Sequence, residues 1–301
     1  MGINRVVTVG QGKGGVGKTS LTGNVGAMLA ADLVESGSSG RVLLVDMDHQ
    51  GNLARELGYQ PDSGDEFVRS MIADSPLPVI RDVRPQLDVV PGGPSLGDLS
   101  AFFGARTQRG GGSLDDVFIH QLGEVAGEYE LILIDTPPGD RIVVEAAMAA
   151  SAAVIIPTRS DDASLDGVER VAERFMAVRD RNPDLQLAGV VLFAIGSRSR
   201  RLERDVRATL QKVLGDAAPV FDTWIRSLET AAVDARRRGL LVHELEQAAG
   251  ADKAQRIAKL RAKEEITDAL YSRDPSGLAD DYSKLTREIL QRVVQLEQVE
   301  V

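Results

Sequence analysis

The sequence contains no cysteine among its 301 residues. Disulfide bonds, thiolate zinc sites, iron–sulfur clusters and cysteine nucleophiles are therefore excluded. It also lacks an apolar run of the roughly 20 residues that a membrane-spanning helix needs, and no charged-then-apolar leader precedes the first strand-like segment. We therefore expect a soluble, cytoplasmic protein.

Positive charge is in the minority. Lysine and arginine number 35 against 45 aspartates and glutamates, which gives a net charge of -10. This balance disfavours a protein that is covered with nucleic acid, although a local basic patch can still bind phosphates. With 43% hydrophobic residues, the chain can bury the core of one large domain or somewhat more.

Short β-branched runs alternate with longer segments of helical spacing. The predicted strands are Arg5–Val9, Arg41–Val45, Leu87–Val90, Glu130–Ile134, Ala153–Ile156 and Leu187–Phe193. The predicted helices are Thr19–Leu33, Ile142–Ala149, Leu165–Arg179 and Leu202–Leu214. Most of the strands are apolar throughout, which is typical of a parallel sheet covered on both faces. We predict an α/β fold, a three-layer sandwich with a mostly parallel, twisted sheet.

Composition changes mark loops and a late boundary. Two segments rich in glycine and polar residues, Gly58–Glu66 and Gly104–Ser113, are predicted surface loops. From about Leu240 the sequence becomes charged and helical, with a break at Asp274–Gly277 and no further strand. We predict a sheet domain over residues 1–240 and a helical C-terminal extension over residues 241–301, packed on that domain or on a partner.

A phosphate-binding loop follows the first predicted strand. The segment GKGGVGKT, from Gly12 to Thr19, fits the P-loop pattern and stands between a predicted strand and a predicted helix. Its backbone N–H groups and the helix N-terminus are expected to hold phosphates, Lys18 to contact the β and γ oxygens, and the Thr19 hydroxyl to bind Mg²⁺. The predicted nucleotide-binding residues of this loop are Gly12, Lys13, Gly14, Gly15, Val16, Gly17, Lys18, Thr19 and Ser20.

Acidic residues follow two of the apolar strands. Asp135 ends one of them, the Walker B arrangement, and Asp46 and Asp48 end another. Open α/β sheets hold their ligands outside the carboxyl edge, so these carboxylates are predicted to lie beside the loop. A strand-end acid can instead cap the next turn, and for Asp48 a structural role in its turn stays open.

Together these segments resemble the ParA/MinD family of deviant Walker A ATPases, most closely its small, Soj-like ParA members. The likeness spans roughly Arg5 to His243 and includes, in order, KGGVGKTSLTGN, VLLVDMDHQGNL, LILIDTPPG and IIPTRSDDASLDG. It implies an ATP hydrolase with ATP and Mg²⁺ as cofactors, which works as an ATP-sandwich homodimer. His49 stands where the family usually has proline, which leaves the conformation of that segment open.

The resemblance also implies roles for individual residues. In this family the equivalent of Lys13 reaches across the dimer to the phosphates of the partner, as an arginine finger does; without the resemblance, the ordinary reading of a loop lysine is a solvated charge. Asp46 is implied to orient the attacking water, and Asp135 and Asp46 to hold Mg²⁺ through water. Pro157 and Asp161 are implied to line the adenosine pocket.

Arginines gather in two segments of this acidic chain. The resemblance places both where ParA proteins contact DNA without sequence preference, a mode in which phosphate contacts release counterions and no bases are read. A solvated helix face is the ordinary alternative. The predicted DNA-binding residues are Arg198, Arg200, Arg201, Arg204, Arg207, Arg236, Arg237 and Arg238.

The function implied by the resemblance is ATP-dependent DNA partitioning by a nucleoid-associated ATPase, which a ParB-like centromere-binding protein stimulates. The cargo, whether plasmid, chromosome or protein assembly, stays open. A first alternative is a MinD-like, membrane-associated positioning ATPase, but the last predicted helix, with its apolar stripe from Leu285 to Leu296, ends acidic and so disfavours a membrane surface. A second alternative is a cargo-positioning or assembly ATPase of the same superfamily.

Overall fold

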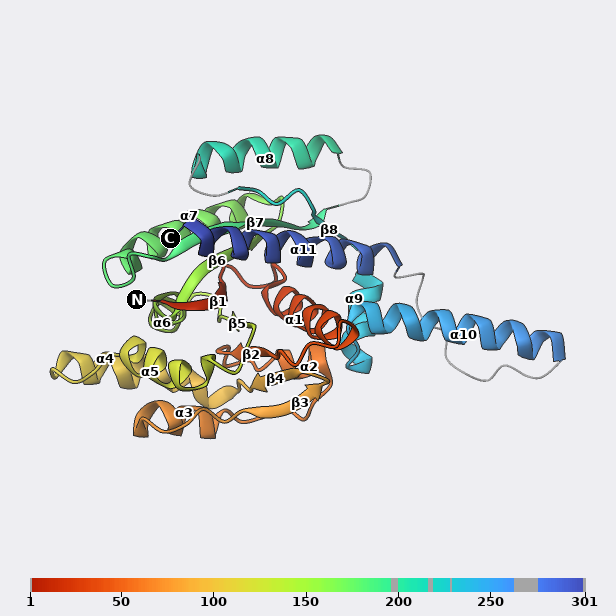
Figure 1. The fold of residues 1–301 in the computed structure, drawn as a ribbon. Helices are drawn as coiled ribbons and strands as arrows, with labels where there is room; N and C mark the ends of the chain where they lie inside the picture. Colours follow the sequence, from red (N-terminus) through yellow and green to blue (C-terminus); the bar gives the residue numbers. More distant parts are fainter. Residues whose placement is uncertain (1, 196–199, 216–218, 228, 263–275, 300–301) are drawn as a thin grey trace.

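An eight-stranded sheet lies at the centre of the part of the chain that the structure describes (Figure 1). The computed structural model describes residues 2–195, 200–215, 219–227, 229–262 and 276–299. The strand order is β3-β4-β2-β5-β1-β6-β7-β8, and every pair is parallel except β3 with β4. The strands are β1 (Ile3–Val9), β2 (Val42–Asp46), β3 (Ile80–Arg84), β4 (Leu87–Val90), β5 (Leu131–Asp135), β6 (Ser151–Thr158), β7 (Gln186–Ile195) and β8 (Ile225–Arg226). The predicted α/β fold with a mostly parallel sheet is confirmed.

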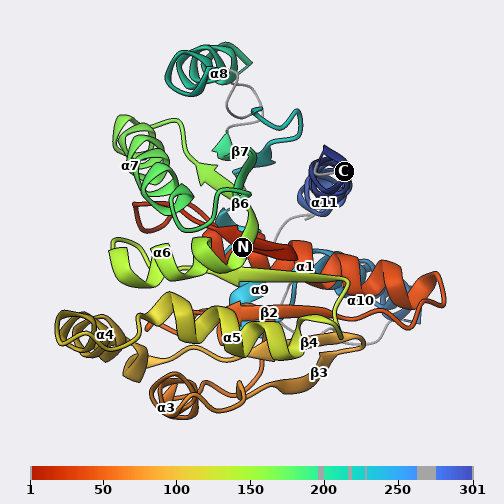
Figure 2. The same ribbon diagram turned by 60° about the vertical axis from the view of Figure 1, so that its left-hand side comes forward.

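Helices cover both faces of this sheet (Figures 1 and 2). One face packs against α1 (Lys18–Glu35), α2 (Leu53–Leu57), α9 (Glu229–Arg238), α10 (Val242–Ala262) and α11 (Ser276–Val299). The other packs against α3 (Asp65–Ala73), α4 (Leu99–Gln108), α5 (Leu114–Ala126), α6 (Arg141–Ala150), α7 (Asp162–Arg179) and α8 (Arg200–Leu214), and a short 3-10 helix, η1 (Pro94–Asp98), precedes α4. In β2, Leu44 joins the first core while Leu43 and Val45 join the second. Burial on both faces explains why the strands are apolar throughout.

Several elements were not predicted from the sequence. Strand β3 is charged and lies at an edge of the sheet, and β8 has only two residues, so neither has a strong strand pattern. The predicted loop Gly104–Ser113 is wrong in its first half, because Gly104 to Gln108 complete α4. Buried Leu99 and Phe103 hold that helix against the sheet despite its polar composition.

The last helix, α11, belongs to the main hydrophobic core. Its apolar stripe consists of Leu285, Ile289, Val293 and Leu296, each at most 7% exposed. These side chains pack in one cluster with residues of α1 and β7. Arg226 of β8 donates from Nε and Nη2 to the two carboxylate oxygens of Asp281, at 2.7 Å each. This bidentate pair fixes α11 over the sheet. No helix in the described part of the chain has the length and apolar character needed to cross a membrane.

A buried carboxylate joins the β3–β4 hairpin to its neighbours. Asp88 of β4 accepts hydrogen bonds from Arg41 Nε at 3.0 Å, Arg81 Nη1 at 2.9 Å and the Tyr129 hydroxyl at 3.0 Å. Burial alone would raise the pKa of Asp88, but the hydrogen bonds led by that of Arg41 hold it below its usual value. Asp88 therefore stays ionised in the interior and serves the fold.

Candidate functional site

The glycine-rich loop connects β1 directly to α1, in the predicted order. Gly15 and Gly17 have φ angles of 76° and 97°, which favour glycine. A Cβ atom on Gly17 would also lie 2.5 Å from the ring of Phe193, so a side chain has no room there. The first N–H groups of α1, which begins at Lys18, have no partner within the helix and are suited to an anion.

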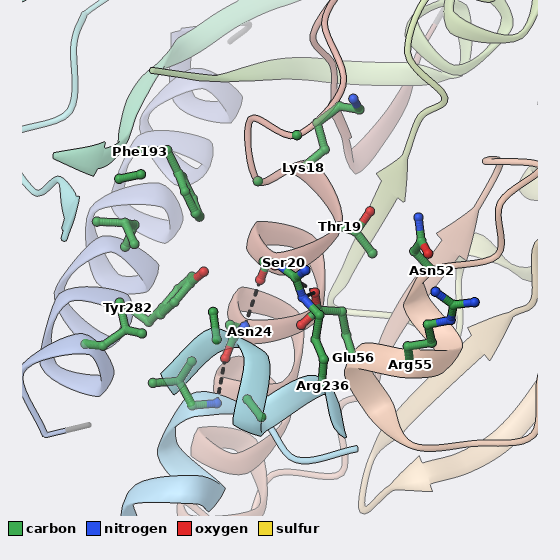
Figure 3. A pocket seen from close by; sticks show the side chains of 18 of the residues that line it. Lys18, Thr19, Ser20, Asn24, Asn52, Arg55, Glu56, Phe193, Arg236 and Tyr282 are labelled. Carbon is green, nitrogen blue, oxygen red and sulfur yellow. Dashed lines mark hydrogen bonds and ion pairs between the residues drawn. The ribbon is translucent and has the colours of Figure 1, made fainter. Parts of the chain in front are cut away.

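A cavity of about 410 Å³ opens at this loop and has two different ends (Figure 3). Its polar end is lined by Gly14, Gly15, Gly17, Lys18, Thr19, Ser20, Asp48 and Pro138. Its apolar end is lined by Phe193, Ile225, Leu278 and Tyr282. Backbone N–H groups and an ammonium suit phosphates, and aromatic and aliphatic side chains suit a base. The shape and chemistry fit a nucleotide.

The apolar end was not predicted from the sequence. Phe193 ends a predicted strand, and its ring meets that of Tyr282 edge-on with the centroids 6.2 Å apart. Tyr282 and Leu278 come from α11, in the segment predicted to be an extension beyond residue 240. The place of Phe193 at the end of a predicted strand was a signal that could have identified it. No local sequence pattern indicates that α11 lies beside the loop.

Three residues of the loop do not line the cavity. The Gly12 N–H donates to the side chain of Gln11 at 2.6 Å, and Val16 is 1% exposed in the interior. Lys13 instead extends to Asp161 of its own chain, with Nζ 2.5 Å from Oδ1. The side chain of Lys13 is 38% exposed, so it lies at the surface beside the cavity.

Pro157 and Asp161, implied to line the adenosine pocket, do not line this cavity either. Pro157 lies within β6, where its carbonyl accepts a hydrogen bond from Gln11 Nε2 at 3.2 Å. Asp161 is held by Lys13. Pro157 lies in β6 and Asp161 in the segment between β6 and α7, whereas residues of β7, β8 and α11 form the apolar end.

The predicted carboxylates meet at the carboxyl edge of the sheet. Asp46 and Asp135 are direct neighbours on β2 and β5, and both are fully buried. Asp46 accepts the N–H groups of Asp48 at 3.0 Å and Leu53 at 3.1 Å. Burial, and then the charge of Asp135, raises the pKa of Asp46 well above its usual value.

The carboxylate of Asp135 is suited to binding a cation. Neither of its oxygens accepts a hydrogen bond of normal geometry, although the Thr19 hydroxyl lies near enough to lower its pKa. Burial outweighs that effect and raises the pKa of Asp135 to about 7. In the described residues no cluster of three or more acids and histidines could hold a metal alone. One hydroxyl and one carboxylate fit Mg²⁺, which takes its remaining ligands from water and nucleotide phosphates.

Lys18 is the buried cation of the loop. It is 6% exposed, and its Nζ donates to the carbonyl of Lys13 across the loop at 3.3 Å. Burial lowers its pKa, while the charges of Asp135 and Asp48 oppose this shift. Phosphates placed in the cavity would raise the pKa of Lys18 and so favour its charged form.

The turn after β2 forms with His49 at the position where the family usually has proline. Asp48 Oδ1 accepts the N–H of Gln50 at 2.9 Å, and the Asp48 carbonyl accepts the N–H of Gly51 at 3.0 Å. The side chain of Asp48 thus shapes the turn, as aspartates do in Asx turns. His49 is half exposed, and its Nδ1 lies 3.5 Å from Asp48.

A polar ladder closes the lower wall of the cavity (Figure 3). Glu56 of α2 accepts hydrogen bonds from Ser20 Oγ at 2.8 Å and from Arg236 Nε at 2.9 Å. Asn24 donates to the Ser20 carbonyl at 2.8 Å and accepts the N–H of Val242 at 3.0 Å. These bonds connect α1 to α2, α9 and α10. Arg236, predicted to bind DNA, is therefore part of the cavity wall.

The remaining predicted DNA contacts separate into two groups. Arg198 lies outside the described residues; Arg200 and Arg201 begin α8, with side chains outside the described part. Arg204 is exposed, whereas Arg207 is held by Glu203 at 2.8 Å and the Asp222 carbonyl at 2.9 Å. Arg237 and Arg238 are exposed on α9, which lies well away from α8 in both views (Figures 1 and 2). Among the arginines whose side chains the structure describes, those of α8 and those of α9 do not form one patch on a single chain.

Replacing Asp135 with asparagine should stabilise the ligand-free protein above neutral pH. Because the pKa of Asp135 is about 7 when folded and about 3.9 in an unfolded chain, the native state binds the extra proton, and its stability falls as pH rises between these values. We expect Asp135→Asn to melt higher than wild type at pH 8, by about 2–4 °C for each kcal/mol gained, and the difference to vanish near pH 4.

The same variant should lose most of the stabilisation that Mg²⁺ and ATP give together, and thermal denaturation from pH 4 to 8 measures both effects. Asp88→Asn is the matched control, since Asp88 is equally buried but its pKa is lowered by its partners. It should melt lower than wild type at pH 8. An Asp135→Asn protein that also melts lower at pH 8 would contradict this account of Asp135.

Known proteins resemble this chain in sequence. A family model described as an AAA domain matches residues 4–187. The chain is 31% identical over 220 residues to the chromosome partitioning protein ParA of Caulobacter vibrioides, covering 71% of this chain and 79% of that protein. It is 29% identical over 209 residues to the sporulation initiation inhibitor protein Soj of Bacillus subtilis, covering 65% and 75%.

A solved structure is similar as well. Cobyrinic acid a,c-diamide synthase from Mycobacterium smegmatis, crystallised with an ATP analogue and magnesium, superposes with a TM-score of 0.64 at 27% identity. The match covers 79% of this chain and 93% of that one.

Proposed function

The chain belongs to the ParA/MinD family of P-loop ATPases, and on that premise we propose that it is an ATP-dependent DNA-partitioning ATPase. One observation carries the proposal: the P-loop at which the cavity opens also brings Lys18 and Thr19 close to the buried carboxylate of Asp135, the neighbour of Asp46 in the sheet. The reaction proposed is Mg²⁺-dependent hydrolysis of ATP to ADP and phosphate. Sequence identity to ParA over most of the chain favours partitioning over the other activities of such folds.

In this proposal each residue of the polar end has a defined task. The N–H groups of Gly14 to Thr19 and the ammonium of Lys18 hold the phosphates. Thr19 and Asp135 hold Mg²⁺, Asp135 through water, and the metal supplies positive charge to the phosphates. Asp46 orients the attacking water through its free lone pairs. Positioning and charge neutralisation suffice, since phosphoryl transfer needs no covalent intermediate.

Lys13 acts, in this proposal, across a homodimer closed around ATP. In the single chain its ammonium is paired with Asp161 at the surface and does not reach its own cavity. An exposed ion pair of this kind is worth about 1 kcal/mol or less, so the phosphates of a facing subunit can displace it. Hydrolysis is then coupled to dimerisation.

DNA binding is the third part of the proposal. Exposed Arg204 of α8 and Arg237 of α9 supply charge at separate places, and pairing of two subunits would double the number of phosphates that the protein can bind. This makes binding to non-specific DNA dependent on ATP and places the protein on the nucleoid. A ParB-like centromere-binding protein is the proposed activator of hydrolysis.

The test is retention on non-specific duplex DNA with Mg²⁺ and either ATP or ADP. We expect the protein to be retained on DNA with ATP but not with ADP. Replacing Arg204 and Arg237 with alanine should weaken it, and the slope of log affinity against log salt should become shallower by about 0.9 for each phosphate that the variant no longer neutralises. Arg109→Ala, which removes an exposed arginine at the end of α4, is the control and should bind as wild type does. Retention that is equal with ATP and ADP would contradict the proposal.

Binding to vesicles of anionic lipid, with and without ATP, tests the MinD-like alternative. The apolar stripe of α11 is at most 7% exposed and packs on the chain's own sheet. We therefore expect no ATP-dependent binding to the vesicles. ATP-dependent binding to vesicles without retention on DNA would favour the alternative instead.

A further inference from the structure

Arg159 is a cation in the cavity wall that has no task in the reaction described above. It directly follows β6, whose last residue is Thr158, and it lines the cavity together with Gly14, Gly15 and Pro138. Its Nε atom is buried and has no hydrogen-bond partner. Within the described residues the structure gives its guanidinium no ion pair either.

The other cations near the cavity differ from Arg159 in this respect. Lys18 donates to the Lys13 carbonyl and lies near Asp135. Lys13, Arg226 and Arg236 are paired with Asp161, Asp281 and Glu56, respectively. Arg55 also lines the cavity, but it is exposed, so water satisfies its donors.

A buried donor without a partner is costly. Leaving such a group unsatisfied destabilises the folded protein, and more so when the group is charged. Native proteins rarely tolerate it without a reason, and one common reason is an acceptor that arrives with a ligand. The cavity beside Arg159 is the place where the nucleotide phosphates are proposed to lie.

We propose that Arg159 binds the phosphates of a nucleotide held by its own chain, in addition to Lys18 and the loop. This inference rests on the proposed function and deepens it. The planar fork of an arginine binds phosphate oxygens through two parallel hydrogen bonds, and a fixed donor in a partly buried site needs little reorganisation. We assign it to its own chain because it lines the same cavity as Lys18, whereas Lys13 does not.

The test compares binding of a fluorescent ATP analogue, with Mg²⁺, to the full chain and three variants. We expect Arg159→Ala to bind at least about tenfold more weakly, since a charged hydrogen bond contributes about 1.5–3 kcal/mol. Arg159→Lys should regain part of the affinity as a point charge. Arg109→Ala removes an exposed arginine outside the cavity and should bind as wild type does.

Thermal denaturation without nucleotide separates binding from a structural role. Because Arg159 has no partner to lose, Arg159→Ala should melt at the wild-type temperature or above it. A clear drop in melting temperature, or unchanged affinity for the analogue, would overturn the inference. So would unchanged affinity combined with slower hydrolysis, which would place the contact across the dimer.

Failure of the inference is distinguishable from failure of the proposed function. If the wild-type chain does not bind the ATP analogue, the proposed function itself is wrong. If wild type binds it and Arg159→Ala binds it equally well, only the role of Arg159 is wrong.

Discussion

Lys18→Ala should abolish binding of ATP, weakening it by about 100-fold or more. The Lys18 ammonium lies at the polar end of the cavity and is 6% exposed, so its bonds to phosphate form away from bulk water. Hydrogen bonds to a charged group contribute about 1.5–3 kcal/mol each, and each 1.4 kcal/mol is a tenfold change in affinity. Calorimetric titration with ATP and Mg²⁺ measures the loss.

Lys284→Ala is the matched control for this variant. Lys284 is an exposed lysine of α11, so its removal changes the charge equally without touching the cavity. It should bind ATP as wild type does. A folded Lys18→Ala protein with wild-type affinity would show that the loop does not hold the phosphates.

Asp46→Ala should bind ATP and dimerise but hydrolyse ATP at least about 100-fold more slowly. A side chain that positions or accepts the proton of the nucleophile contributes about 10² to 10⁴ in rate. Because Asp46 also accepts the N–H groups of Asp48 and Leu53, its removal leaves two buried donors unpaired. Phosphate release measures the rate, and light scattering measures the dimer.

Asp46→Asn keeps an acceptor oxygen for one of the two N–H groups and retains the shape of the side chain, so it disturbs the fold less than Asp46→Ala does. It should be as slow as Asp46→Ala and more stable. Hydrolysis at the wild-type rate by either variant would refute the role assigned to Asp46.

The central part of the site could be predicted from the sequence because it follows from local patterns. A glycine-rich loop between strand and helix and an acid after each buried strand are short signals, and the topology of a parallel sheet brings strand ends together. In the structure Lys18 lines the cavity, and Asp46 and Asp135 are buried neighbours on adjacent strands. The strands β3 and β8 escaped prediction, because an exposed edge and a two-residue strand have little hydrophobic pattern.

The rest of the site depends on contacts between distant segments. Tyr282 reaches the loop only because the apolar stripe of α11 packs on the sheet, and the sequence does not state where that stripe packs. Composition likewise showed which segments are rich in arginine, but it did not show which side chains or carbonyls these arginines bind. Arg207 and Arg236 turn out to be bonded within the chain, which composition alone cannot distinguish from exposed charge.

The most direct test of the central claim, that Lys13 acts on the phosphates of the partner, is ATP hydrolysis by a mixture of two inactive variants. Lys13→Ala and Asp46→Ala should each be at least about 100-fold slower than wild type. In a mixed dimer one site has its own Asp46 and receives Lys13 from the other subunit. Random pairing in a two-fold dimer then predicts recovery to about a quarter of the wild-type rate. No recovery on mixing would contradict the account, because each lysine would then serve only its own chain or neither.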